Sequence, residues 1–183
     1  MEIEKELVHQ CKKGDRIAQE RVYALYSRQM YVVCQRYCKS QLEAEDVLQE
    51  AFIKVFKNIE QFRAEATFGA WIKRIVVNTA LNSQRSKLYM FPMTDVETLK
   101  NESDENISLS GFELEELLAM IQSLPEGCQA IFNLYAIEGY SHREIAEKLG
   151  ISEGTSKSQY FRAKALLKEM IEKEEKMSYE RAK

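Results

Sequence analysis

Aromatic, basic and amide side chains are interleaved between residues 62 and 85. Aromatic faces stack on unpaired bases, cations follow the phosphate backbone, and an asparagine amide can hydrogen-bond a base edge. The combination predicts a surface that suits single-stranded or opening DNA better than closed duplex. In the alternative interpretation Phe68 and Trp71 are core residues, and we expect Trp71 to be at least half buried. The predicted contacts are Phe62, Arg63, Phe68, Trp71, Lys73, Arg74, Asn78, Asn82 and Arg85.

A second group of candidates follows a glycine turn near the C-terminal end. Ser141 and Glu144 have the spacing of a capping box, Gly150 can end that helix in the left-handed conformation, and Ser152 can cap the next one. Helix, short turn and helix predict a helix-turn-helix, whose second helix can enter a major groove. The alternative is a surface helix with ordinary charges. The predicted contacts are Thr155, Lys157, Ser158, Gln159, Phe161 and Arg162.

A third group has the character of a protein-binding face rather than a nucleic-acid-binding one. Acidic, amide and apolar side chains recur at helical spacing in the stretch that follows Ser40. They are either solvated residues or the contact surface for a partner helix. The group consists of Asp46, Gln49, Glu50, Ile53 and Lys54.

The sequence lacks the residue patterns of a catalyst. It contains no nucleophile–base pair, no phosphate-binding glycine loop and no cluster of metal ligands at the usual spacing. His9 and His142 are the two histidines, and His142 follows a cap, where we expect surface or DNA-backbone contact. The four cysteines are expected to be reduced, small buried hydrophobes. We therefore expect no enzyme activity, no cofactor and no metal.

Apolar residues at intervals of three and four, including Leu25 and Leu42, predict buried helical stripes throughout, with Ser40, Thr67 and Pro125 at helix starts. Seven glycines and two prolines are too few for an all-β fold. We predict an all-α protein of two small helical domains. The first spans residues 1–91, a flexible acidic linker spans 92–110, and the helix-turn-helix domain spans 111–183.

Charge is distributed unevenly along this chain of 183 residues, whose formal net charge is −3. Residues 54–91 hold seven Lys and Arg against two Asp and Glu, whereas residues 92–126 hold one against nine. Such asymmetry predicts separate surfaces for separate partners. No apolar run approaches the roughly 20 residues of a membrane helix, and the N-terminus does not read as a signal peptide. We expect a cytoplasmic protein without a membrane span.

These stretches together resemble the bacterial sigma-70 family, specifically its extracytoplasmic-function (ECF) group. DVLQEAFIKVFKNI resembles the segment that binds the clamp helices of RNA polymerase. FGAWIKRIVVNTALNSQR resembles the promoter-melting and minus-ten segment, and YSHREIAEKLGISEGTSKSQYFRAKALL is similar to the minus-thirty-five helix-turn-helix. The sequence departs from the usual pattern at Ser156, Gln159 and Tyr160, where valine, arginine and an aliphatic residue are common.

The resemblance implies a transcription initiation factor. Its expected partners are core RNA polymerase, through the clamp helices and the flap, and promoter DNA, both duplex and melted strand. An anti-sigma protein can also be expected to hold such a factor inactive. By this resemblance Asp46, Gln49 and Glu50 contact polymerase. Asn78 and the loop from Phe62 to Phe68 read an exposed minus-ten base, and the upstream element is contacted by Lys157, Ser158, Phe161 and Arg162.

Two other kinds of protein stay open at this point. A stand-alone helix-turn-helix regulator, with the N-terminal unit as a dimerisation or sensor domain, would bind duplex DNA without polymerase. An interaction module would bind its protein partner equally well after Lys157 and Arg162 become alanine.

Overall fold

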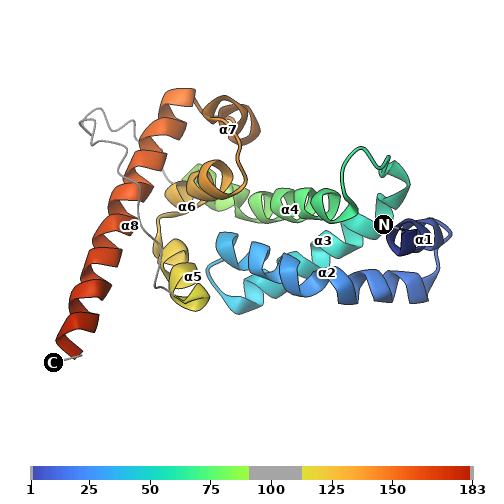
Figure 1. The fold of residues 1–183 in the computed structure, drawn as a ribbon. Helices are drawn as coiled ribbons and strands as arrows, with labels where there is room; N and C mark the ends of the chain where they lie inside the picture. Colours follow the sequence, from blue (N-terminus) through green and yellow to red (C-terminus); the bar gives the residue numbers. More distant parts are fainter. Residues whose placement is uncertain (1, 91–112, 182–183) are drawn as a thin grey trace. The chain divides into compact units, whose positions relative to one another are not determined.

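The computed structural model describes residues 2–90 and 113–181, drawn as coloured ribbon in Figure 1. Within these ranges the chain forms helices and turns and no strand, so the predicted all-α class is confirmed. The contacts divide the chain into two compact units, Met1–Ser86 and Lys87–Lys183. The predicted linker, 92–110, lies outside the described residues. No helix in the described part of the chain is long and apolar enough to cross a membrane.

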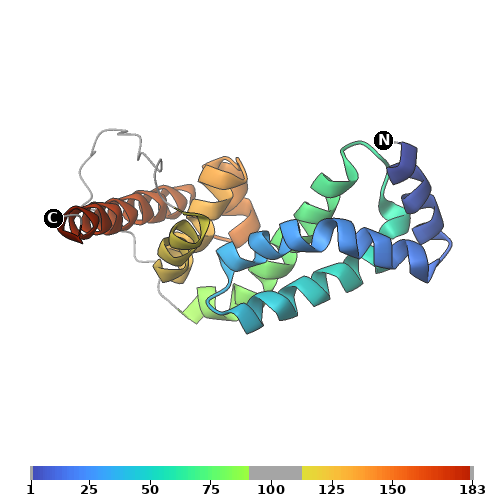
Figure 2. The ribbon, with the colours of Figure 1, turned by 60° about the horizontal axis from the view of Figure 1, so that its bottom comes forward.

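The first unit is built from four α-helices and one short 3-10 turn. They are α1 (Glu2–Lys12), α2 (Arg16–Tyr37), α3 (Gln41–Lys57), η1 (Ile59–Gln61) and α4 (Phe68–Met90). Helices α2 and α3 lie side by side, as Figure 2 shows, and α1 packs against both α2 and η1. The core between these helices is apolar, with Val22, Met30, Val55, Ile72 and Val76 among its fully buried side chains.

Local hydrogen bonds explain where the helices of this unit begin. The Ser40 hydroxyl accepts a hydrogen bond from the Glu43 amide at 3.2 Å, so the predicted cap of α3 is confirmed. The Glu43 carboxylate accepts a hydrogen bond from the Lys39 amide at 2.8 Å, which adds a second bond at the start of this helix. At the start of α4 the Thr67 hydroxyl accepts from the Ala70 amide at 3.3 Å, as predicted.

Two leucines assigned to the apolar stripes lie on the surface instead. Leu25 of α2 is 64% exposed and Leu42 of α3 is 70% exposed. Leu42 precedes the buried Ala44 by two residues, which turns it roughly 200° from the core side of the helix. Leu25 shares its side of the helix with the buried Ala18 and Val22, so helix rotation does not explain its exposure. Apolar spacing predicted the burial of both leucines, and the faces that neighbouring helices cover decide otherwise.

The second unit contains four α-helices and a π turn. They are α5 (Leu114–Ser123), α6 (Glu126–Phe132), η2 (Asn133–Ile137), α7 (His142–Leu149) and α8 (Glu153–Arg181). A buried cluster joins α5, α6 and α8, and Ala163 and Leu167 contribute to it from α8. The other buried members of this cluster are Met120, Leu124, Cys128 and Ile171.

The helix-turn-helix is formed by α7, the glycine turn and α8. Ser141 and Glu144 make both hydrogen bonds of a capping box, which fixes the start of α7. Gly150 ends the helix in the left-handed region with φ of +68°, where a side chain would cost energy. The Ser152 hydroxyl then accepts from the Thr155 amide at 2.9 Å and caps α8. These bonds confirm the predicted turn residue by residue.

The four cysteines are free thiols, and all of them are buried, as predicted. Burial raises the pKa of the Cys34 thiol to about 12, so this side chain is protonated at neutral pH. Cys38 lies one helical turn further along, at the C-terminal end of α2, and is also fully buried. Among the described residues no group of His, Cys, Asp or Glu is placed to hold a metal ion.

Candidate nucleic-acid interface

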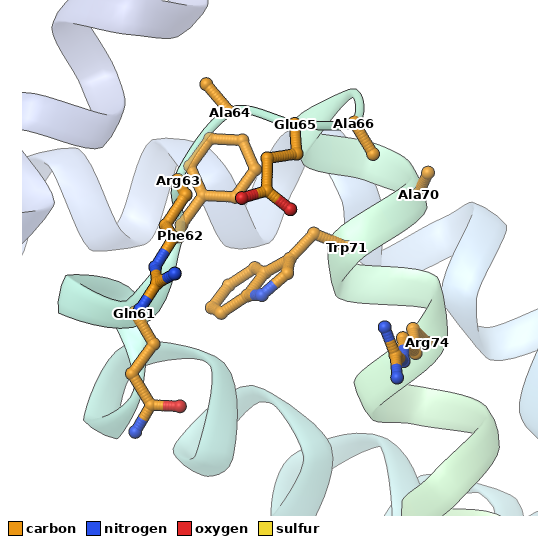
Figure 3. Close-up of a pocket in the computed structure, with 9 residues that line it drawn as sticks. All are labelled: Gln61, Phe62, Arg63, Ala64, Glu65, Ala66, Ala70, Trp71 and Arg74. Carbon is orange, nitrogen blue, oxygen red and sulfur yellow. The ribbon is translucent and has the colours of Figure 1, made fainter.

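A pocket of about 350 Å³ lies between η1, the loop that follows it and the first turns of α4 (Figure 3). The Trp71 indole projects from α4 towards the loop, and Arg74 extends from the next turn of the helix. Arg63 and Glu65 lie on the loop side, so the pocket combines an aromatic surface with charges of both signs. The nine lining residues are Gln61, Phe62, Arg63, Ala64, Glu65, Ala66, Ala70, Trp71 and Arg74.

Three aromatic rings form the back of this pocket. The ring centroids of Phe62 and Trp71 are 5.4 Å apart, and those of Phe62 and Phe68 are 5.1 Å apart. Phe68 stacks on Trp71 at 5.8 Å with 15° between the ring planes. Phe68 is only 2% exposed, so the prediction that it contacts DNA is corrected. Its ring is covered by its aromatic neighbours because it begins α4 on the core side, whereas Phe62 and Trp71 stay partly exposed.

The loop from Phe62 to Thr67 has a strained backbone at Ala64. This residue has φ of +58°, which is the left-handed region that non-glycine residues rarely enter. The conformation costs about 1–2 kcal/mol and persists only where the surrounding structure holds it. Strain of this kind occurs often at binding sites, and here the strained residue lies in the wall of the pocket.

Other predicted contacts follow α4 away from the pocket. Trp71, Arg74, Asn78 and Asn82 recur at intervals of three and four and therefore share one side of the helix. Arg74 and Asn82 are exposed, and Asn78 is partly buried. Lys73 follows Trp71 by two residues and is turned roughly 200° from it, so it does not join this side. The side chain of Arg85 lies outside the described residues.

Helix α8 presents three of the predicted contacts to solvent. Lys157 and Arg162 are exposed, and Phe161 is 40% exposed, which is unusual for a large apolar ring. The Lys157 ammonium lies 2.8 Å from the Glu153 carboxylate, one helical turn earlier. Ser158 is partly buried, and its hydroxyl donates to the Thr155 carbonyl at 3.1 Å.

Two residues predicted to face DNA lie on the buried side of α8. Thr155 and Gln159 are each 6% exposed, because they are two residues away from Lys157 on either side and are turned roughly 160–200° from it. The Cys128 thiol of α6 donates a hydrogen bond to the Gln159 side-chain oxygen at 3.0 Å. Gln159 is therefore a structural residue of the unit and does not read an adenine from this position.

The two remaining departures from the usual family sequence also lie underneath the helix. The fully buried Ser156 hydroxyl is 2.9 Å from Nδ1 of His142. Tyr160 packs on Phe132 and Tyr135, with ring centroids 6.2 and 4.5 Å apart. His142 stacks on the exposed Tyr135 at 4.2 Å and is itself partly exposed, so its predicted role as a surface or DNA-backbone contact stays a prediction. Burial and the nearby Lys157 lower the pKa of His142, which favours the neutral ring.

The predicted protein-binding face is exposed on α3. Asp46, Gln49, Glu50 and Ile53 all reach solvent, and Ile53 is 54% exposed. Lys54 points partly towards α4, where its ammonium lies 2.7 Å from the Glu50 carboxylate and 3.4 Å from the Thr79 hydroxyl. Sequence reasoning missed the exposed Leu42, which precedes Asp46 by one helical turn and extends the same face.

Sequence reasoning also missed part of the pocket lining. Gln61 lies immediately before the predicted loop from Phe62 to Phe68, and Ala70 lies between this loop and Trp71. Gln61 ends the short η1 turn and donates from its amide to the Asn58 side-chain oxygen at 3.1 Å. The alternation of small and charged residues in QFRAEAT was the available signal, since it is typical of an exposed loop and not of a helix.

The comparisons with known proteins agree with this organisation. Residues 22–88 match the model of sigma-70 region 2, and residues 114–167 match the model of sigma-70 region 4. Region 2 thus covers the pocket and the α3 face, and region 4 covers the helix-turn-helix.

Curated relatives extend the likeness to nearly the whole chain. It is 33% identical over 179 residues to the ECF RNA polymerase sigma-E factor of Haemophilus influenzae, with 91% of this chain and 94% of that protein covered. It is 30% identical over 178 residues to the ECF RNA polymerase sigma-E factor of Escherichia coli, with 91% and 93% covered. The chain belongs to the ECF group of the sigma-70 family, whose members are transcription initiation factors and not catalysts.

A solved structure has the same fold at lower sequence identity. It is the sigma factor RpoE from Bartonella quintana in complex with the anti-sigma factor NepR, at a TM-score of 0.53 and 18% identity. The alignment covers 84% of this chain and 96% of that one. At this level of identity the likeness supports the fold.

Proposed function

We propose that this chain binds core RNA polymerase and directs it to promoters by reading two separated DNA elements. The first unit reads a minus-ten element as the strands open, and the helix-turn-helix reads a minus-thirty-five element in duplex DNA. The observation that carries the proposal is the pocket in the region 2 part of the chain, where a partly exposed tryptophan lies between Arg63 and Arg74.

Within the pocket, an unpaired minus-ten base stacks on the open side of the Trp71 indole. Base–aromatic stacking contributes about 1–3 kcal/mol per base. Arg63 and Arg74 neutralise the phosphates on either side, and Glu65 and Gln61 offer acceptors to the base edge. Asn78 and Asn82 continue the contact along α4 towards the next nucleotides. Phe68 supports the tryptophan from behind without touching DNA.

The minus-thirty-five element is read by the exposed side of α8. Lys157 and Arg162 contact phosphates or guanine edges, and the exposed Phe161 ring suits the methyl group of a thymine. Ser158 contributes a shorter contact. Thr155 and Gln159 act from beneath, since they hold the helix against the rest of the unit.

The exposed face of α3 binds the polymerase. Leu42, Asp46, Gln49, Glu50 and Ile53 combine apolar and acidic side chains, which fits a clamp helix that carries basic residues. The flap is the expected partner of the second unit. Tethering explains how a chain with a net charge of −3 reads DNA. Two weak DNA contacts gain from the effective concentration that the polymerase provides.

Inhibition by an anti-sigma protein is part of the same proposal. The Bartonella quintana relative was solved with such a protein, NepR, and this chain has the same fold. A partner of this kind would act by covering the α3 face or the DNA-reading surfaces.

A pull-down with bacterial core RNA polymerase, followed by transcription in vitro from a library of promoter fragments, tests the proposal. We expect a stable complex and transcripts that start at a shared pair of sequence elements. The double variant Asp46→Ala, Ile53→Ala should lose the complex and keep the fold. Tight duplex binding by the chain alone, with no complex with core polymerase, would instead establish a stand-alone regulator.

A further inference from the structure

Helix α1 lies before the segment that matches the family model, yet it contacts the pocket directly. The Lys12 ammonium, in the last turn of α1, donates a hydrogen bond to the backbone carbonyl of Phe62 at 3.1 Å. Phe62 begins the loop that forms one wall of the pocket, and its ring belongs to the aromatic cluster behind it. A side chain 50 residues away in sequence is therefore hydrogen-bonded to the first residue of the loop.

The body of α1 keeps Lys12 in place. Leu7, Val8 and Cys11 are buried, with exposed fractions of 7%, 8% and 2%. Their helix packs on α2 and on η1, the turn that ends immediately before Phe62. Lys12 is partly buried, whereas the adjacent Lys13 is exposed. The two lysines thus carry the same charge at the same end of the helix, and Lys12 alone is hydrogen-bonded to the loop.

A second connection links α1 to the other side of the pocket. The Tyr26 hydroxyl of α2 donates to the Glu4 carboxylate of α1 at 2.7 Å. The Tyr26 ring meets Phe68 edge to face at 5.8 Å, and a Cβ at Gly69 would lie 3.0 Å from its Cε1 atom. Burial and the bond to Glu4 raise the pKa of Tyr26 to about 12, so the hydroxyl stays a donor at neutral pH. Tyr26 thereby fixes the first turn of α4, from which Trp71 projects.

We propose that Lys12 is a positioning residue for the base pocket, holding the strained loop in its base-accepting conformation before DNA arrives, with the Glu4–Tyr26 pair supporting the opposite wall. If the loop is already ordered in the free protein, DNA binding does not carry the entropic cost of ordering it. This inference rests on the proposed function, because it deepens the account of the minus-ten site.

Trp71 gives a direct measurement, since it is the one tryptophan in the chain. We compare full-length Lys12→Met with Lys13→Met, a matched loss of one charge, and with the conservative Lys12→Arg. In the free proteins, acrylamide quenching of Trp71 fluorescence measures how open the pocket is. We expect Lys12→Met to change the quenching constant about twofold or more, consistent with loss of a charge-assisted hydrogen bond. Lys13→Met and Lys12→Arg should match the wild type.

Binding is then measured by quenching with single-stranded oligonucleotides of about 12 nucleotides, a length within the usual site sizes. The probes are oligo-dT and three variants with one central dA, dC or dG. Lys12→Met should weaken binding about tenfold and reduce the preference among central bases, as expected when a loop must be ordered on binding. Lys13→Met should weaken it about twofold at most, and the loss should shrink with added salt.

Each outcome has a distinct meaning. Equal losses in Lys12→Met and Lys13→Met would show that Lys12 acts through its charge alone and would overturn the inference. Wild-type Trp71 accessibility in Lys12→Met would also overturn it, whether or not DNA binds. If no oligonucleotide quenches the free wild-type protein, binding is measured by the anisotropy of labelled oligonucleotides on its complex with core polymerase. No binding there, while the acrylamide difference remains, would overturn the minus-ten proposal and leave the positioning of the loop standing. Tyr26→Phe, which removes only the bond to Glu4, is a second variant should Lys12→Met unfold.

Discussion

The two surfaces that we propose to read DNA, a minus-ten site in the first unit and a minus-thirty-five site in the second, are built on opposite principles. The minus-ten site is concave, and it is assembled from η1, a strained loop and the start of α4. The minus-thirty-five site is convex, and its side chains project from a single capped helix, with Lys157 and Phe161 on one face and Arg162 turned roughly 140° from Lys157. A concave site can enclose one unpaired base, whereas a projecting helix reads a groove. In both, few residues are proposed to touch DNA, and buried side chains such as Phe68 and Gln159 lie beneath them.

The largest expected effect comes from removing the buried support of the concave site. Phe68→Ala leaves a cavity between Tyr26, Phe62 and Trp71 and should lower the free energy of unfolding by about 3–5 kcal/mol. Chemical denaturation followed by circular dichroism measures the change. A variant with wild-type stability would show that Phe68 is not the structural centre of the site.

Removal of the exposed ring should affect binding more than stability. Trp71→Ala should weaken binding of melted minus-ten strand by about 1–3 kcal/mol, because one stacking surface is lost. Duplex binding through the helix-turn-helix should stay unchanged, which separates the two sites. Potassium permanganate footprinting of the open complex, with the polymerase present, measures the opening. Equal losses at both elements would mean that the variant acts by unfolding the chain.

On the convex site, single charges should have smaller and more uniform effects. Lys157→Met removes one phosphate contact and should reduce the slope of log affinity against log salt by about 1 across all duplex sequences. Gln159→Glu, in contrast, should change the stability of the unit first, since its side chain is buried against Cys128. Fluorescence anisotropy at several salt concentrations provides the slopes. A sequence-selective loss in Lys157→Met would assign it to a base instead.

The smallest expected effect is a pH dependence in the second unit. The pKa of His142 is lowered by its burial and by Lys157, while Glu153 opposes this shift. The folded unit therefore binds this proton at a lower pH than the unfolded chain, in which the histidine has the ordinary pKa of 6.5. The stability that results is complete above about pH 6.5 and declines as the pH falls through that value towards the folded pKa. Thermal unfolding of wild type and His142→Phe at each pH measures it.

His142→Phe retains a ring to stack on Tyr135 and cannot titrate. Its melting temperature should fall less steeply than that of the wild type between about pH 7 and pH 5.5. Parallel curves for the two proteins would assign the acid sensitivity to other groups.

Features that depend on interactions between residues close in sequence could be predicted from the sequence, and features that depend on distant residues could not. The caps at Ser40, Thr67 and Ser152 and the left-handed Gly150 depend on bonds within about four residues, so spacing alone predicted them. The family segments were predicted for the same reason, because each is a short contiguous motif.

The errors concern faces of helices and contacts between distant segments. Leu25 and Leu42 were assigned to the core by apolar spacing, and Thr155 and Gln159 to the DNA face by polarity. Which side of a helix is covered depends on its neighbours, and single-sequence periodicity cannot supply that information. The hydrogen bond from Lys12 to the Phe62 carbonyl joins residues 50 positions apart and involves a backbone atom, so no side-chain pattern in the sequence predicts it.

Several side chains on the inner side of α8 are matched to residues on other helices, and this limits how the promoter preference of the protein could be re-engineered. Ser156, Gln159 and Tyr160 are matched to His142, Cys128 and Tyr135 on other helices. A complete recognition helix transplanted from a relative with valine and arginine at the first two positions would bring a buried cation against Cys128. We therefore expect that a relative's promoter preference can be introduced by exchanging only the solvent-facing Lys157, Phe161 and Arg162 for that relative's residues. Replacement of the entire helix should cause misfolding.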